Sequence, residues 1–132
     1  MSKQEMDAVI QLLNANQADG DPSVEEQRAG MEALAGSFPL PEGAQQRAET
    51  IAGVPCEWQS VEGAKDDAVL LYFHGGGYVI GSVNTHRGLV SGFSGASGIT
   101  GLSVDYRLAP EHPFPAAVED AVAVYHALLE QG

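Results

Sequence analysis

The chain has 132 residues, 44% of them hydrophobic, which is enough to bury the core of one domain or of part of one. Its formal net charge of −12 argues against nucleic acid and anionic membrane surfaces as partners. A single cysteine excludes an intrachain disulfide, and no apolar run approaches the ~20 residues of a membrane span. The N-terminus lacks the pattern of a signal peptide, so we expect a cytoplasmic protein.

Two helices are predicted ahead of any strand. The first follows a capping box of Ser2 and Glu5, and its apolar residues recur at helical spacing: Met6, Val9, Ile10, Leu12 and Leu13. The second begins at Asp21-Pro22 or at Ser23. Helices in this position usually cover something, so we interpret residues 1–43 as a helical segment that packs on the body or forms a lid over a pocket.

Four strands are predicted after this segment. Residues 47–52 and 55–60 form a hairpin around Gly53-Val54, and residues 68–73 are apolar throughout, as in a strand covered on both faces. A helix capped by Asn84 or Thr85 then runs to about Gly98, before a second apolar strand at 99–104. A strand, helix, strand unit of this kind indicates a parallel pair with a right-handed crossover.

The last part of the chain combines a proline-rich loop with a helix. Three prolines between residues 108 and 115 predict an irregular reversal, in which one of the bonds Ala109-Pro110 and Phe114-Pro115 is cis. Pro115 suits the first position of the helix that follows, which has the strongest apolar stripe in the chain. The elements from residue 44 onward therefore predict an α/β fold.

Three consecutive glycines end the strand at 68–73, and spacing separates three interpretations of them. A phosphate-binding P-loop would require a Gly-Lys-Ser/Thr ending, but no lysine follows Lys65. The dinucleotide fingerprint G-x-G-x-x-G of an oxidoreductase fits poorly, because there is one residue too many before Gly81. The H-G-G-G oxyanion loop of lipases and esterases fits without adjustment.

Two motifs together resemble one family, the hormone-sensitive-lipase-like esterases of the α/β-hydrolase fold. H-G-G-G-Y at 74–78 matches the oxyanion motif of that family, and D-Y-R-L-A-P-E-H-P-F-P-A-A at 105–117 matches its second signature. The resemblance covers nearly the whole chain, including the two N-terminal helices, which look like part of the family's cap. It implies an N-terminal cap segment at 1–43 and the first part of a hydrolase sheet, with helices on both faces, at 44–132.

The resemblance also implies the chemistry. Gly75, Gly76 and Gly77 would form the oxyanion hole, whose N–H groups stabilise the ester oxygen during serine acyl transfer. The family's G-x-S-x-G elbow matches nothing in these residues, so we expect its serine, acid and histidine in a C-terminal part beyond Gly132. No cofactor is implied, and the expected partners are a small ester and that missing part.

Other polar residues have a structural interpretation beside the chemical one. We expect His74 to support the loop through backbone contacts rather than act as a base, while Tyr78 either lines the acyl pocket or packs in the core. A structural charge network around Arg107 is favoured over a catalytic carboxylate pair for Asp105, Glu111 and Asp120. No metal site is predicted, because His86, His112 and His126 lack ligand spacing.

The sequence thus predicts a carboxylic ester hydrolase that is catalytically incomplete as given. The alternatives are a small-molecule-binding protein of the same fold, in which catalysis has been lost, and a dinucleotide-binding oxidoreductase. In the fold that the chain resembles, the strand at 68–73 lies inside the sheet, between the strand at 99–104 and the strand of the missing part. Its far edge should therefore be unpaired here, which predicts aggregation or pairing with another chain, including formation of a homo-oligomer.

Overall fold

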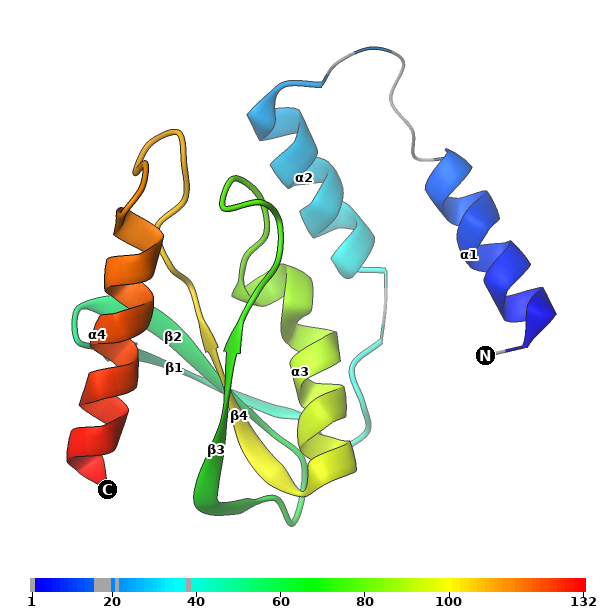
Figure 1. Ribbon diagram of the computed structural model, residues 1–132. Helices are drawn as coiled ribbons and strands as arrows, with labels where there is room; N and C mark the ends of the chain where they lie inside the picture. The colour runs from blue at the N-terminus through cyan, green and yellow to red at the C-terminus, as the bar shows by residue number, and fades with distance from the viewer. Residues whose placement is uncertain (1, 16–19, 21, 38) are drawn as a thin grey trace.

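A computed structural model describes residues 2–15, 20, 22–37 and 39–132 (Figure 1). Four strands form one mixed sheet in the order β1-β2-β4-β3. The strands are β1 (Gln45–Ile51), β2 (Val54–Ser60), β3 (Lys65–Phe73) and β4 (Ile99–Val104), and the helices are α1 (Lys3–Ala15), α2 (Val24–Ala35), α3 (Val83–Ser97) and α4 (Ala116–Gln131). The architecture is the predicted α/β fold.

The β1–β2 hairpin is present, but its turn lies one residue earlier than predicted. Ile51 pairs with Val54, so the turn residues are Ala52 and Gly53, with φ values of 51° and 82°. Positive φ at both central positions is typical of a type I′ turn, whose twist matches that of the flanking strands. The strand boundaries predicted at Ala52 and Pro55 were therefore wrong by one residue each.

The unit β3–α3–β4 is parallel, as predicted, and two of its boundaries differ from the prediction. β3 begins at Lys65, three residues early, with an irregular register between Lys65 and Val69. The N-cap of α3 is Ser82 rather than Asn84 or Thr85, and Ser82 forms a reciprocal capping box with Thr85. Among the described strands, β3 has β4 as its one neighbour, so its other edge is unpaired.

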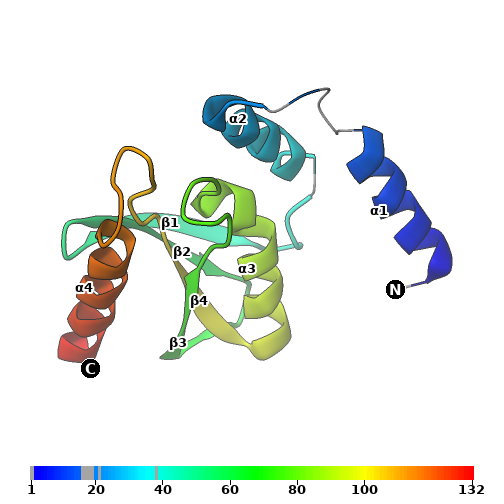
Figure 2. The same cartoon turned by 45° about the horizontal axis from the view of Figure 1, so that its top comes forward.

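Side chains alternate between the two faces of the sheet, and one face is apolar while the other is polar. Cys56 pairs with Val104 and Trp58 with Leu102, and these side chains share the face that packs against Val124 of α4. The alternate residues face α3: Glu57, Gln59, Gly101 and Ser103. Figure 2 shows α3 and α4 on opposite sides of the sheet. The apolar core therefore lies under α4, and a buried polar layer lies under α3.

The loop that joins β4 to α4 makes the predicted sharp reversal. Both of its candidate bonds, Ala109-Pro110 and Phe114-Pro115, are cis, where one was predicted. Pro115 is the N-cap of α4, not its first helical residue. The loop consequently carries residues from the end of β4 across to the start of a helix on the apolar face.

The two N-terminal helices are present where they were predicted. α1 has the Ser2–Glu5 capping box, and all of its residues are exposed. α2 begins with a capping box of Ser23 and Glu26, whereas Asp21 lies outside the described residues. α1 stands apart from the sheet in Figures 1 and 2, while α2 packs against α3. Within the described part of the chain, no helix is long and apolar enough to cross a membrane.

Candidate active site

The candidate site lies where β3 ends and the chain turns through Gly75–Gly77. Gly76 has a φ of 124° and Gly77 a φ of 62°. A Cβ added at Gly76 would lie 2.0 Å from the Ile80 carbonyl oxygen, closer than any side chain permits. Glycine is therefore required at position 76 both by conformation and by the close approach of the backbone.

His74 fixes the first peptide of this loop. The side chain is buried, with 5% of its surface exposed, and its Nδ1 lies 2.8 Å from the Gly75 carbonyl oxygen. Because a carbonyl can only accept, Nδ1 carries the proton of this bond. Tyr106 stacks on the imidazole at 4.3 Å and donates its hydroxyl to the His74 carbonyl at 2.5 Å. The Gly75 oxygen and the Gly76 N–H belong to one planar trans peptide and point in opposite directions, so a bond that holds the oxygen also fixes the direction of the N–H.

A tight turn fixes the second peptide in the same manner. The Gly76 carbonyl oxygen accepts hydrogen bonds from the N–H groups of Val79 at 3.1 Å and Ile80 at 3.0 Å. The Gly77 N–H, on the far side of the same peptide plane, is therefore directed away from the turn. Among the described residues, none accepts a hydrogen bond from the Gly76 or Gly77 N–H. Two adjacent donors are thus held in place and left available.

Gly76 and Gly77 line a cleft of about 480 Å³ between the glycine loop and α4. Its walls are mainly apolar and aromatic, and they include Phe73, Tyr78, Tyr106, Val118 and Val122. Tyr78 is 62% exposed with a φ of 63°, so its side chain lies at the cleft and not in the core. Core packing, one of the two interpretations of Tyr78, is therefore wrong. An apolar cleft beside two backbone donors can hold a small carbonyl compound.

The predicted charge network around Arg107 is divided among three places. Arg107 binds Asp120 through Nε and Nη2, at distances of 2.8–3.0 Å, and also contacts Glu119. Asp105 instead accepts a hydrogen bond of 3.3 Å from the Val83 N–H at the start of α3. Glu111 pairs with Arg28 of α2. A single network of Arg107 with all three carboxylates is therefore wrong.

Known proteins share this fold. A family model described as alpha/beta hydrolase fold matches residues 70–132. An acetyl-hydrolase of Streptomyces hygroscopicus is 40% identical over the whole chain, which spans 44% of that relative. The crystal structure of an esterase from the bacterial hormone-sensitive lipase family superposes with a TM-score of 0.93 at 45% identity. The chain belongs to the hormone-sensitive-lipase-like family of α/β hydrolases.

Other members of the family agree with this assignment. The esterase LipI of Mycobacterium tuberculosis is 52% identical over 64 residues, which are 48% of this chain and 20% of LipI. A hormone-sensitive lipase from a metagenome library has a TM-score of 0.87 at 46% identity, covering 99% of this chain and 43% of its own. The chain thus spans less than half the length of these α/β hydrolases and matches their N-terminal portion.

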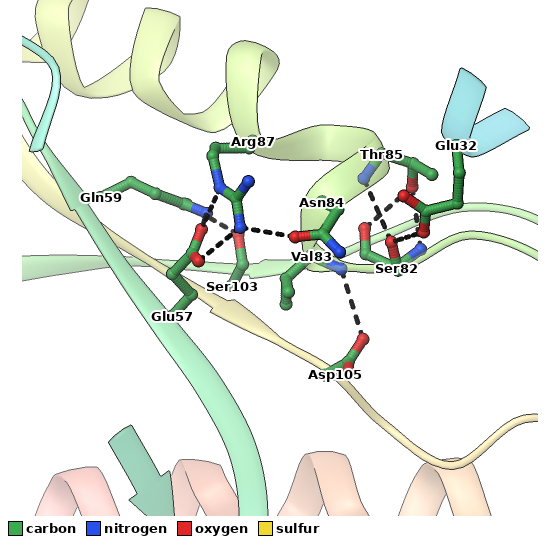
Figure 3. Close-up of polar contacts among 10 residues, drawn as sticks. All are labelled: Glu32, Glu57, Gln59, Ser82, Val83, Asn84, Thr85, Arg87, Ser103 and Asp105. Carbon is green, nitrogen blue, oxygen red and sulfur yellow. Dashed lines mark hydrogen bonds and ion pairs between the residues drawn. The ribbon is translucent and has the colours of Figure 1, made fainter. Parts of the chain in front are cut away.

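The polar layer under α3 is held together by side-chain hydrogen bonds (Figure 3). Arg87 binds both oxygens of Glu57 at 2.7 Å, Gln59 donates to Glu57, and Ser103 donates to Gln59. Burial alone would raise the pKa of Glu57, but the Arg87 guanidinium and the Gln59 amide hold it below its ordinary value. Arg87 also binds Asn84, so the layer fixes the start of α3.

Sequence reasoning missed two residues that hold the glycine loop and the turn after it. Tyr106 and Arg28 both contact the site, and neither was singled out. Tyr106 lies inside the second signature, between Asp105 and Arg107, which was its available signal. Arg28 is the one cation in the sequence of α2, and its partners lie 51 to 83 residues away along the chain. No local pattern identifies partners at such separations.

His86 and Cys56 have structural surroundings. His86 stacks on His74 at a ring distance of 5.5 Å, and burial lowers its pKa. Across the described residues, no group of three or more His, Cys, Asp or Glu side chains is placed to hold a metal. Cys56 is buried in the core, and burial raises the pKa of its thiol to about 11.

Proposed function

We propose that this chain supplies the oxyanion-binding loop and part of the acyl pocket of a carboxylic ester hydrolase that acts by serine acyl transfer. The observation that carries the proposal is the pair of N–H groups at Gly76 and Gly77: both residues line an apolar cleft, and neither N–H has an acceptor among the described residues. The names of the relatives, which include an acetyl-hydrolase and esterases, support an ester as substrate.

In this reaction a serine oxygen attacks the ester carbonyl, and the carbonyl oxygen gains negative charge in the tetrahedral intermediate. The Gly76 and Gly77 N–H groups would donate to that oxygen, and loss of one such donor costs roughly 2.7–4 kcal/mol of transition-state stabilisation. His74 would act as loop support, and Tyr78 would contact the acyl or alcohol group. The serine, its base and its acid would come from the remainder of the esterase fold, since these 132 residues contain no G-x-S-x-G.

The test measures turnover of p-nitrophenyl acetate and butyrate by three samples. These are the chain alone, the separately produced C-terminal part of the esterase domain, and their mixture. We expect hydrolysis above background only in the mixture. Binding of the ester without turnover by the mixture would favour a small-molecule-binding protein of the same fold and would contradict the proposal.

A backbone change tests one of the two donors, the Gly77 N–H, without adding a side chain. Replacing the amide N–H of Gly77 by an ester oxygen should lower kcat by roughly 10²–10³-fold, the effect of one lost oxyanion donor. The same replacement at Gly63, in the turn before β3, is the matched control. Proline would be a poor substitute at position 76, because its fixed φ of about −65° conflicts with the observed 124°. Equal activity of the Gly77 and Gly63 variants would exclude the loop as the oxyanion site.

A further inference from the structure

One side chain of α2 contacts both signature loops. Nε of Arg28 donates to the Val79 carbonyl at 2.8 Å, and one terminal nitrogen donates to the Ala109 carbonyl at 2.9 Å. The same guanidinium binds both carboxylate oxygens of Glu111, at 2.8 Å and 2.9 Å. Its planar set of donors therefore joins three partners on two loops that are about thirty residues apart in the sequence.

The contact with Val79 is part of the turn that orients Gly77. The Val79 N–H is one of the two donors that hold the Gly76 carbonyl, and the Val79 carbonyl is held by Arg28. One helical turn later, Glu32 of α2 accepts a hydrogen bond of 2.5 Å from the Ser82 hydroxyl (Figure 3). Residues four apart lie on one face of a helix, so this face of α2 holds both ends of the segment 79–82.

We propose that Arg28 is a positioning residue for the oxyanion loop: it anchors Val79, and through Val79 it holds the peptide whose N–H belongs to Gly77. The inference rests on the proposed function for its effect on catalysis. Its effect on the geometry of the turn is independent of any activity. Displacement of α2 then loosens the Gly77 donor, so α2 acts on the site through the backbone of the turn.

A simpler explanation is that Arg28 serves only as the ionic partner of Glu111. Hydrogen bonding to Arg28 lowers the pKa of Glu111 to about 2, so the pair is charged at every pH used in an esterase assay. The variant Glu111→Gln separates the two explanations. It removes the charge of the partner but leaves Arg28 free to bind the Val79 and Ala109 carbonyls.

The deciding measurement is amide hydrogen exchange of Val79 and Ile80 by NMR in the 132-residue chain, relative to the Leu102 amide in the centre of the sheet. Arg28→Met should accelerate their exchange by about tenfold, as expected for loss of one charge-assisted hydrogen bond. Arg28→Lys and Glu111→Gln should have smaller effects. Arg47→Met, which removes an exposed arginine paired with Glu49 on β1, is the matched control and should have none.

The activity measurement uses the mixture described above. Arg28→Met should lower kcat by roughly 10- to 100-fold, less than removal of a whole donor, while KM changes little. Unchanged exchange at Val79 and Ile80, or an effect of Glu111→Gln equal to that of Arg28→Met, would overturn the proposal. If the unmodified mixture shows no turnover, the proposed function fails, and the exchange experiment still decides whether Arg28 holds the turn.

Discussion

Replacing Arg87 by methionine should destabilise the chain by roughly 3 kcal/mol at pH 7, the lower end of the range for breaking a buried ion pair. The change removes two bonds of 2.7 Å to Glu57 and one of 2.5 Å to Asn84. It leaves a carboxylate whose side chain is only 10% exposed, with the Gln59 amide as its remaining donor. The lower end applies because the Arg87 side chain is 29% exposed and already partly screened by water.

The loss should depend on pH with a definite sign. In the unmodified chain the pKa of Glu57 is lower in the folded state than its ordinary value of 4.5. Its contribution to stability is therefore present above about pH 4.5 and is lost as the pH falls through the pKa of the folded state. Without Arg87, burial dominates and the pKa of Glu57 rises. Protonation of Glu57 at lower pH then removes the unpaired buried charge of the variant. The difference in unfolding free energy between the two proteins should therefore shrink between pH 7 and pH 4.

The assay is urea unfolding followed by fluorescence of Trp58 and by circular dichroism at both pH values. Arg47→Met is the control, because its exposed pair with Glu49 should be worth about 0–1 kcal/mol. A loss below about 1 kcal/mol for Arg87→Met at pH 7 would refute a stabilising role for this buried pair. An equal loss at both pH values would refute the attribution of the loss to the buried charge of Glu57.

Three further predictions concern the loop, the core and the sheet edge. Gly81→Ala should lower the unfolding free energy by about 1–3 kcal/mol, because the φ of Gly81 is 97° and the new Cβ would lie 2.6 Å from the Gly75 oxygen. Gly92→Ala in α3 is the control and should not lower the unfolding free energy, because no atom lies within 4 Å of the added Cβ. Cys56, with a thiol pKa raised to about 11, should react with a disulfide reagent at pH 8 about 100-fold more slowly in the folded than in the unfolded chain. Sedimentation velocity should show association of the chain through the unpaired edge of β3, reduced by Val69→Lys; a stable monomer at high concentration would contradict this.

The sequence predicted the elements of this fold better than their ends. All four strands and all four helices were expected, because apolar runs, helical spacing of apolar residues, and cap or turn residues each leave a local signal in the sequence. The ends of the elements were displaced by one to three residues, because local backbone angles set the hairpin turn and side-chain hydrogen bonds set the helix caps. Ser82 is an example: its capping box with Thr85 begins α3 two residues before the expected Asn84.

The sequence indicated where the glycine loop of the candidate site lies, but not the hydrogen bonds and ion pairs that hold the surrounding residues. The glycine loop and Tyr78 could be located because a motif places them together at a strand end. The partners of Glu111 and Asp105 could not, since charge pairing depends on which loops the tertiary structure brings into contact. The polar layer at Glu57, Gln59 and Ser103 was also missed, because it becomes visible only once the register of β2 with β4 is known.

The long sequence separation of the Arg28 contacts has a kinetic consequence. Val79 and Glu111 lie 51 and 83 residues from Arg28, so α2 can dock only after both loops have taken their places at the end of the sheet. Contacts that form after the folding transition state influence unfolding rather than folding. Substitutions in this face of α2 should therefore leave the refolding rate nearly unchanged and speed up unfolding, so this helix sets how long the oxyanion loop keeps its shape rather than how fast it forms.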